Sequence, residues 1–314
     1  MSILGSAEAW IIPGYLDRRD GRLTMDDRDL VDLAGERGTP LYVYSARRIV
    51  DTAQRLREAF QRADPRTTIC FASKALSAIK PLRLLRDEGL SIEVNSGGEL
   101  FRAGIAGFPP SAIVFNGVAK TIDELAAALS PPIKAINIDS LFELDRVAAV
   151  ARGLGCRARV ALRIVPGVHS PTSPGNQTGS AATKFGMLES ELGAAIEILK
   201  AAPEALQLVG LHAHVGSQIT DVAPYVAAVE VLARRVRDVE AALGPRLEHV
   251  NVGGGFPLPY MRGVNRTPQG DIFAPRIDAA DIAGAALPAL RKLLGPEIEA
   301  IVEPGRRMVG DAAV

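Results

Sequence analysis

The feature that most constrains the fold is a regular alternation of short runs rich in valine and isoleucine with longer stretches of helical periodicity. The short runs are almost continuously apolar, as expected of strands that are covered on both faces. These strands are predicted at 67–74, 90–96, 112–117, 135–140, 159–165, 208–216, 249–255 and 300–305. Amphipathic helices are predicted between them at 77–88, 122–129, 141–154, 189–201 and 223–243.

Repeated strand–helix units predict parallel strands joined by right-handed crossovers. Eight of them match a closed (β/α)8 barrel of the TIM type, in which functional residues lie at the C-terminal ends of the strands. A doubly wound open sheet is the alternative, but no Gly-x-Gly-x-x-Gly turn follows the first strand, so its dinucleotide-binding version loses support. Asp139-Ser140 ahead of one helix and Thr121 ahead of another have the chemistry of helix N-caps.

The first forty residues precede this alternation. We expect residues 1–40, with a strand-like run at 22–25, to be an N-terminal segment that belongs to a largely absent β domain, and residues 41–314 to form the α/β barrel. A further strand-like run at 41–44 leads into a helix predicted to begin near Arg47.

The charge balance excludes some classes of partner. Lys plus Arg and Asp plus Glu both number 36, so the chain lacks the basic excess typical of proteins that bind nucleic acid or anionic membrane. Cys70 and Cys156 form neither a disulfide framework nor a zinc motif. The apolar stretch at 9–15 is too short and too broken for a signal peptide or a membrane span. We expect a cytoplasmic protein with a small-molecule partner.

Nearly every predicted strand ends in a polar or glycine residue. One such ending carries little weight, because turns need Gly, Asn and Ser in any case, but in a barrel all of these positions converge on one mouth. His212 and His214 lie two apart on one strand and share a face. No Cys or HExxH partner accompanies them, so no metal site is expected. The polar stretch 169–183 is predicted to be a mobile loop at the mouth. The endings are Lys74, Asn95-Ser96, Asn116-Gly117, Asp139-Ser140, Arg163, His214 to Ser217, Gly253 to Gly255 and Glu303 to Arg306.

Five ordered motifs carry a resemblance to a known family: FASKA at 71–75, SGGEL at 96–100, HAHVGSQ at 212–218, GGGFP at 253–257 and EPGR at 303–306. Together they resemble the signature set of the pyridoxal-phosphate-dependent decarboxylases that share a fold with alanine racemase. Within that group the chain is most similar to the diaminopimelate decarboxylases. GTPLYVY at 38–44 and Lys184-Phe185-Gly186 strengthen the match.

The resemblance implies catalytic roles for Lys74, Glu303 and His214. Lys74 would hold pyridoxal 5'-phosphate covalently; a lysine at the end of an apolar strand is desolvated, which lowers its pKa and favours the nucleophilic amine. Glu303 would pair with the ring nitrogen and keep it protonated. Racemases of this fold carry an arginine there, so Glu303 favours decarboxylation. His214 would stack on the ring. The alternatives are a solvated Lys74 and a surface acid in a Glu-Pro-Gly turn.

The resemblance also implies a phosphate cradle and further cofactor contacts. Backbone N–H groups of Gly253, Gly254 and Gly255, with Ser217, Gly305 and Arg306, would hold the phosphate, although a Gly-Gly-Gly run on its own is a tight turn. Glu93 would lie near the cofactor, and Arg163 would reach its phenolic oxygen side. Arg262 and Arg266 are candidates for the substrate's distal carboxylate.

By resemblance, the reaction is decarboxylation of a basic or diamino amino acid by a homodimer. The expected substrate is meso-2,6-diaminopimelate, giving L-lysine and CO2. Ornithine, arginine, lysine or a siderophore precursor are alternatives, and a non-catalytic pyridoxal-phosphate-binding barrel is an alternative of another class. Glu303 disfavours racemisation.

In relatives of this kind a β domain follows the barrel and carries a Cys-Glu-Ser motif and a tyrosine that reach the active site. Neither Cys70 nor Cys156 has the context to replace that thiol. We therefore expect a barrel without its closing helix and second domain, with apolar surface exposed beside the last strands. Such a chain should bind the cofactor weakly and turn over little or no substrate.

Overall fold

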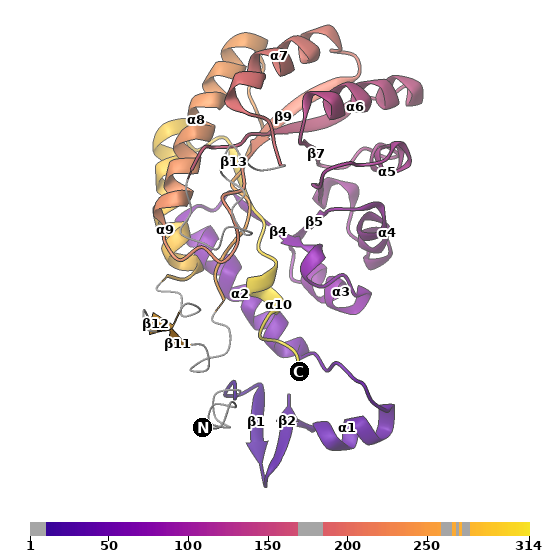
Figure 1. The fold of residues 1–314 in the computed structure, drawn as a ribbon, viewed down its shortest axis with the longest axis vertical. Helices are drawn as coiled ribbons and strands as arrows, with labels where there is room; N and C mark the ends of the chain where they lie inside the picture. The colour runs from indigo at the N-terminus through magenta and orange to yellow at the C-terminus, as the bar shows by residue number, and fades with distance from the viewer. Residues whose placement is uncertain (1–10, 169–184, 259–265, 268–269, 272–276) are drawn as a thin grey trace.

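Eight parallel strands close into a barrel, which confirms the predicted fold class (Figure 1). The computed structural model describes residues 11–168, 185–258, 266–267, 270–271 and 277–314. Around the barrel the strands follow the order β10-β13-β4-β5-β6-β7-β8-β9, and neighbours pair in parallel. They are β4 (Thr67–Ala72), β5 (Ser91–Val94), β6 (Ile113–Phe115), β7 (Ala135–Ile138), β8 (Ala158–Arg163), β9 (Leu206–His212), β10 (His249–Asn251) and β13 (Glu299–Val302).

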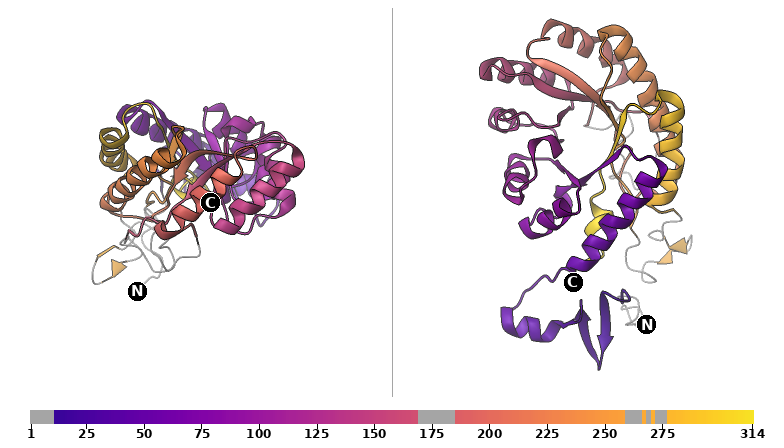
Figure 2. Two further views of the ribbon diagram at one scale, coloured as in Figure 1. Left: turned by 90° about the horizontal axis from the view of Figure 1, so that it is seen from above. Right: turned by 180° about the vertical axis from the view of Figure 1, so that it is seen from behind.

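Helices cover the outside of the barrel between successive strands (Figures 1 and 2). The two N-caps predicted from sequence are confirmed: the Thr121 side chain accepts from the Glu124 backbone N–H in a capping box, and the Ser140 side chain accepts from that of Glu143. The helices are α3 (Ile79–Asp87), α4 (Gly97–Ala106), α5 (Ile122–Ala128), α6 (Leu141–Leu154), α7 (Leu192–Ala201), α8 (Ala223–Leu243) and α9 (Ala279–Leu294).

We expected a missing closing helix and exposed apolar surface beside the last strands, and that expectation was wrong. Helix α2 (Ala46–Ala63), which precedes the first barrel strand, packs against both α9 and α3 and so takes the place of a closing helix (Figure 1). Its face of Ile49, Ala53, Leu56 and Phe60 is buried in the core. Asp64, at the end of α2, forms an ion pair with Arg291 of α9.

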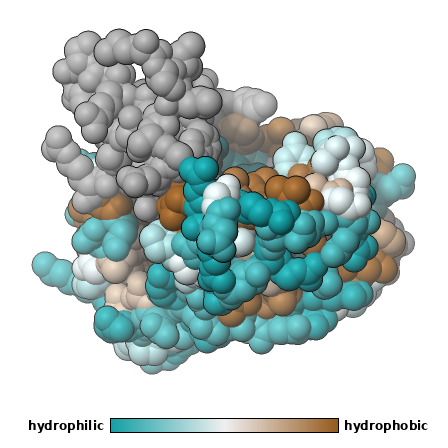
Figure 3. All heavy atoms as spheres, turned by 90° about the horizontal axis from the view of Figure 1, so that it is seen from below, coloured by the Kyte–Doolittle hydropathy of each residue, from teal (hydrophilic) through white to brown (hydrophobic). Residues whose placement is uncertain are grey.

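The remaining apolar exposure lies elsewhere. Tyr42 is 79% exposed, Phe142 of α6 71% and Phe101 of α4 69%. Among the described residues, none of the exposed large apolar side chains lies on α8, α9, β10 or β13. Seen from below, hydrophilic residues cover most of the visible surface, with apolar residues scattered among them (Figure 3). In the described part of the chain, no helix combines the length and apolar character needed to cross a bilayer.

The barrel strands end earlier than the sequence predicted. Strand β10 stops at Asn251 instead of 255, and β9 stops at His212 instead of 216. The polar and glycine residues at these ends leave the hydrogen-bonded ladder and form the loops of the mouth. The predicted run at 41–44 contributes only an isolated bridge between Tyr44 and Ala313.

A small antiparallel sheet precedes the barrel. Strands β1 (Leu16–Arg19), β2 (Arg22–Met25) and β3 (Arg28–Asp29) pair in sequence order, and α1 (Leu30–Arg37) follows. The strand predicted at 22–25 is therefore confirmed. Figure 2 shows this unit at one end of the molecule, beyond the N-terminal end of α2. The other short elements are β11 (Arg266–Thr267), β12 (Gly270–Asp271) and α10 (Arg306–Val309).

The barrel interior is polar at both ends and apolar in a thin middle layer. Cys70, Val114 and Ile301 come from three different strands and pack together, which is possible only inside the barrel. Below them, Lys134, just before β7, forms a 2.8 Å ion pair with Glu299 of β13 on the opposite side. The polar side chains at the C-terminal ends of the strands lie on the other side of this apolar layer, where functional sites of this fold are found.

A buried lysine ties two of the strand ends to a helix. Lys120 is 1% exposed, and its Nζ donates to the Gly117 carbonyl (2.6 Å), the Asn137 carbonyl (2.9 Å) and Glu143 Oε1 (2.8 Å). Glu143 Oε2 in turn accepts from the Asp139 backbone N–H at 2.7 Å. This network fixes the loops that follow β6 and β7 relative to α6.

Replacing Lys120 with methionine should leave Glu143 as an uncompensated buried charge. We expect Lys120→Met to lower the free energy of unfolding by about 3–5 kcal/mol, measured by urea denaturation. Arg152→Met, which breaks the exposed Arg152–Glu204 pair, is the matched control and should change stability little. Equal losses in the two variants would contradict the account.

Candidate active site

The predicted strand endings converge on one cavity. It has a volume of about 780 Å³ and lies at the C-terminal ends of the barrel strands, where sites of this fold are found. Two of the predicted cofactor-binding glycines, Gly253 and Gly254, are not in its lining. The predicted site residues that do line it are Lys74, Glu93, Arg163, His214, Ser217, Gly255, Glu303, Gly305 and Arg306.

Glu303, directly after β13, is the centre of a buried hydrogen-bond network. Asn116 Nδ2 donates to both of its oxygens at 3.0 Å, and Asn251 Nδ2 donates to Oε1 at 2.7 Å. His212 Nε2 lies 3.4 Å from Oε2. Burial opposes ionisation, but the charge of His212 and the hydrogen bond from Asn251 outweigh it, so the pKa of Glu303 falls to about 2. Glu303 is therefore an ionised, buried carboxylate and not a surface acid.

Glu93 on β5 is the opposite case. The residue is fully buried, and neither of its carboxyl oxygens has a hydrogen-bond partner. Burial and the nearby Glu303 carboxylate raise the pKa of Glu93 to about 8, although the positive charge of Lys74 and the Asn116 amide oppose them. At neutral pH the cavity floor therefore holds one ionised and one protonated carboxyl group.

Arg163 and His214 form one wall of the cavity. Arg163, the last residue of β8, lies 3.5 Å from Asp139 Oδ1 and stacks over the ring of Phe185. His214 Nδ1 accepts from the Gly254 backbone N–H at 3.2 Å. Burial and the positive charges of Arg163 and Lys74 hold the pKa of His214 well below its ordinary value, so its imidazole is neutral.

Lys74 lies in a 3₁₀ turn (Ser73–Ala75) that follows β4. The expected desolvation of this lysine was wrong, because the turn leaves the strand and exposes the residue on an open cavity. The turn itself is fixed from behind. Ser73 Oγ donates to Glu99 Oε2 at 2.5 Å, and the same oxygen accepts from the Asn95 backbone N–H at 2.9 Å. Glu99 thus joins the ends of β4 and β5 beneath the lysine.

The glycine run behaves differently from the sequence expectation. The Gly253 N–H donates to Asn251 Oδ1 and the Gly254 N–H donates to His214 Nδ1, so side chains of the barrel already use both groups. A Cβ on Gly254 would collide with the carbonyl oxygen of Glu303, and one on Gly255 with that of Gly216. The run is therefore needed first for close packing of three strand ends, and only Gly255 reaches the cavity wall.

Sequence reasoning missed Asn251 and gave Asn116 no role. Asn116 lies two positions after Val114, which faces the barrel interior, and Asn251 lies two positions before Gly253. Because side chains two apart on a strand share a face, this spacing is the signal that could have found them. Arg262 and the stretch 169–184 lie outside the described residues, and only the backbone of Arg266 is described. Among the described residues no three His, Cys, Asp or Glu side chains form a metal-binding group.

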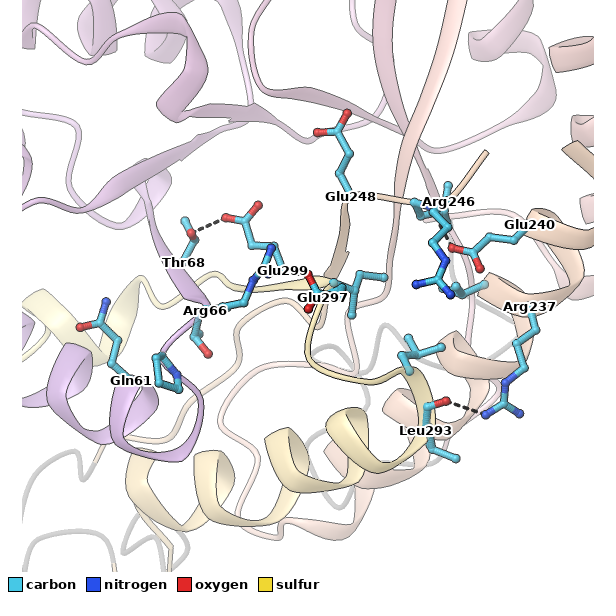
Figure 4. A pocket seen from close by; sticks show the side chains of 16 residues that line it. Gln61, Arg66, Thr68, Arg237, Glu240, Arg246, Glu248, Leu293, Glu297 and Glu299 are labelled. Carbon is cyan, nitrogen blue, oxygen red and sulfur yellow. Dashed lines mark hydrogen bonds and ion pairs between the residues drawn. The ribbon is translucent and has the colours of Figure 1, made fainter. Parts of the chain in front are cut away.

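A second large cavity, of about 920 Å³, lies at the opposite end of the barrel (Figure 4). Most of its charged groups have partners within the protein. Arg66 lies 3.2 Å from Glu297, Arg237 donates to the Leu293 carbonyl, and Thr68 donates to Glu299. We assign the active site to the cavity at the C-terminal strand ends, where the unpartnered Glu93 lies.

The buried, protonated Glu93 makes stability depend on pH. Its pKa is higher in the folded than in the unfolded protein, so folding favours the proton and stability falls as pH rises from about 4.5 to 8. Glutamine cannot ionise, so we expect the free energy of unfolding of Glu93→Gln to fall by up to about 1.4 kcal/mol less per pH unit than that of wild type. Urea denaturation across this range measures it, with Glu58→Gln on the exposed face of α2 as the surface reference. Parallel curves for wild type and Glu93→Gln would refute it.

Gly254→Ala should destabilise the mouth of the barrel. The added Cβ must displace backbone at the ends of β10 and β13, so we expect a loss of about 1–3 kcal/mol in the free energy of unfolding. Gly193→Ala is the control, because this glycine lies in α7 with open space around it. There alanine should stabilise the helix by up to about 1 kcal/mol. Equal stability of Gly254→Ala and wild type would contradict the close packing of Gly254 against the Glu303 carbonyl.

Comparison with known proteins identifies the family. Residues 46–310 match the model of the pyridoxal-dependent decarboxylase, pyridoxal binding domain. The chain is 37% identical over 303 residues to diaminopimelate decarboxylase of Methanocaldococcus jannaschii, covering 94% of this chain and 66% of that protein.

Solved structures agree. A crystal structure of diaminopimelate decarboxylase from M. jannaschii superposes with a TM-score of 0.82 at 34% identity, covering 95% of this chain and 68% of that one. The enzyme from Helicobacter pylori complexed with L-lysine gives 0.78 at 32% identity, covering 90% and 67%. The chain spans about two thirds of the length of the curated relatives it matches. It belongs to the pyridoxal-dependent decarboxylases and contains their pyridoxal-binding barrel.

Proposed function

We propose that this chain is the barrel of an enzyme that decarboxylates meso-2,6-diaminopimelate to L-lysine and CO2. The observation that carries the proposal is a buried, ionised Glu303 in the floor of a cavity that Lys74 also lines. Similar proteins named diaminopimelate decarboxylase support the choice of substrate, and one of them has been solved with L-lysine.

The residues of the cavity fit pyridoxal phosphate, the family's cofactor. The volume of about 780 Å³ lies within the ordinary range of cofactor pockets. Glu93 keeps two buried oxygens without a protein partner, as expected where a ligand completes the hydrogen bonding. Basic groups at the rim, Arg306 and Arg163, suit an anionic ligand.

Three side chains divide the catalytic work in this proposal. When bound, the cofactor would supply an electron-withdrawing ring that stabilises the electron pair left on the α-carbon as CO2 departs. Lys74 Nζ, exposed on the cavity, is the amine that holds the cofactor covalently. Glu303 keeps a negative charge at the floor, which favours a protonated ring nitrogen. The neutral imidazole of His214 offers a flat surface without a competing charge.

Binding roles follow from the same geometry. We assign the phosphate to the rim formed by Ser217, Gly255, Gly305 and Arg306, which all line the cavity. Gly253 and Gly254 would shape this rim from behind, because their N–H groups are used by Asn251 and His214.

The remaining contacts involve the cofactor's other edge and the substrate. Asp139 and Phe185 hold the Arg163 guanidinium, which suits it to the phenolic oxygen side. Arg262 and Arg266 remain predicted contacts of the substrate's distal carboxylate.

Three wider assignments belong to the proposal. We place residues 1–40 in a unit distinct from the barrel at 41–314, since in the described part of the chain β1, β2 and β3 pair with no barrel strand. Cys70 and Cys156 are free thiols, as suits a reducing cytoplasm. A homodimer is expected from the family resemblance.

Covalent attachment of the cofactor provides the first test. Borohydride reduction of the protein mixed with pyridoxal phosphate should fix the cofactor on the peptide that contains Lys74, identified by mass spectrometry. Lys74→Ala should abolish the adduct, and Lys80→Ala, on the exposed surface of α3, should retain it. An adduct that persists in Lys74→Ala would remove this lysine from its role.

Release of CO2 tests the substrate. Carboxyl-labelled meso-2,6-diaminopimelate, ornithine, arginine and lysine are compared at equal concentration, with Lys74→Ala as the blank. We expect little release overall, and the fastest release from diaminopimelate. Faster CO2 release from another amino acid would make that amino acid the substrate instead. No release from any of them would show that the chain binds the cofactor without catalysing decarboxylation.

A further inference from the structure

The cavity floor contains an acid pair, Glu93 of β5 and Glu303 of β13, with one strand, β4, between them. Both side chains are buried, so two negative charges there would repel in a medium that screens weakly. Two carboxyl groups in this situation share one proton. Which of them is ionised decides where the negative charge of the site lies.

Hydrogen bonding treats the two acids unequally. Glu303 accepts three hydrogen bonds from two amide groups: Asn116 Nδ2 to both oxygens, and Asn251 Nδ2 to Oε1. Neither oxygen of Glu93 has a partner at hydrogen-bonding geometry among the described residues. The Asn116 amide lies close enough to lower the pKa of Glu93 as well, so Asn251 is the donor that acts on Glu303 alone. An ionised carboxylate only accepts hydrogen bonds, and donors directed at it stabilise that form.

The two amides are held with their donors toward Glu303. Asn137 Nδ2 donates to Asn116 Oδ1, and the Gly253 backbone N–H donates to Asn251 Oδ1 at 2.9 Å. Each amide oxygen is therefore engaged on its far side, so turning either amide would place two acceptors against each other or two donors together. Asn116 reaches Glu303 from β6, a strand that is not its neighbour, so the contact spans the barrel interior.

We propose that Asn116 and Asn251 are positioning residues that hold the single negative charge of this acid pair on Glu303 and leave Glu93 as a neutral carboxyl group. The inference rests on the proposed role of Glu303 at the cofactor ring, and adds the groups that determine its charge. Glu93 then presents a hydroxyl to the cavity and can donate a hydrogen bond to a bound anion or oxygen.

Other titratable groups face the pair and are unchanged in the test variants. They contribute to the background against which the amides act, so the comparison must keep them constant. They are Cys70, Lys74, Glu99, Arg163, His212 and His214.

The test titrates both carboxyl groups in the cofactor-free protein by ¹³C NMR of labelled glutamate, with Glu93→Gln and Glu303→Gln used for assignment. In wild type we expect Glu303 to ionise well below Glu93. Asn251→Leu has a similar volume and no donor, and among the described residues Asn251 Nδ2 donates to Glu303 only. This variant should therefore narrow the gap between the two ionisation midpoints by about one to two pH units. Asn251→Ser, which is smaller and keeps a hydroxyl, provides a second variant if the first does not fold.

Asn95→Leu is the matched control. Asn95 lines the same cavity, and its Nδ2 has no hydrogen-bond partner, so its loss should leave both midpoints unchanged. An unchanged gap in folded Asn251→Leu, or a wild type in which Glu93 ionises at a lower pH than Glu303, would overturn the proposal. Decarboxylation does not enter the measurement, so a failed substrate assignment would leave the titration result standing, and the reverse also holds.

Discussion

The contact on which the site depends is the one between the Glu303 carboxylate and the amides of Asn116 and Asn251. A buried carboxylate is costly unless donors satisfy it. Here one donor comes from β10, next to β13, and the other from the residue after β6, across the barrel interior, so the barrel must be closed before the charge is stabilised. The same closure leaves Glu93 without a partner, which gives two chemically identical side chains opposite protonation states.

Closure itself depends on features away from the mouth. Cys70, Val114 and Ile301 fill a thin apolar layer, and the Lys134–Glu299 ion pair crosses the barrel beneath it. On the outside, α2 fills the space between α9 and α3 and buries Phe60 and Leu56. Lys120 connects the ends of β6 and β7 to α6. These contacts position the strand ends, and the strand ends carry the chemistry.

The glycine run illustrates how a motif can serve packing and function together. Gly254 lies against the carbonyl of Glu303 and Gly255 against that of Gly216, so the absence of side chains lets three strand ends approach one another. The buried Tyr225 of α8 donates to the Gly254 carbonyl and holds the loop from outside. The motif FASKA similarly combines an apolar strand with a turn that exposes Lys74, and Glu99 fixes this turn.

The sequence by itself determined the eight strands, five of the helices between them, the N-caps at Thr121 and Ser140, and the identity of the polar residues at the mouth. These depend on local periodicity and on motifs that are contiguous in the chain. The sequence did not predict helices α4 and α9. Only the tertiary structure decided that α2 closes the ring, that Lys74 is exposed, that Gly253 and Gly254 face away from the cavity, and that Asn251 contacts Glu303. Such contacts join residues far apart in sequence, and their hydrogen bonds and burial exist only once the barrel has closed.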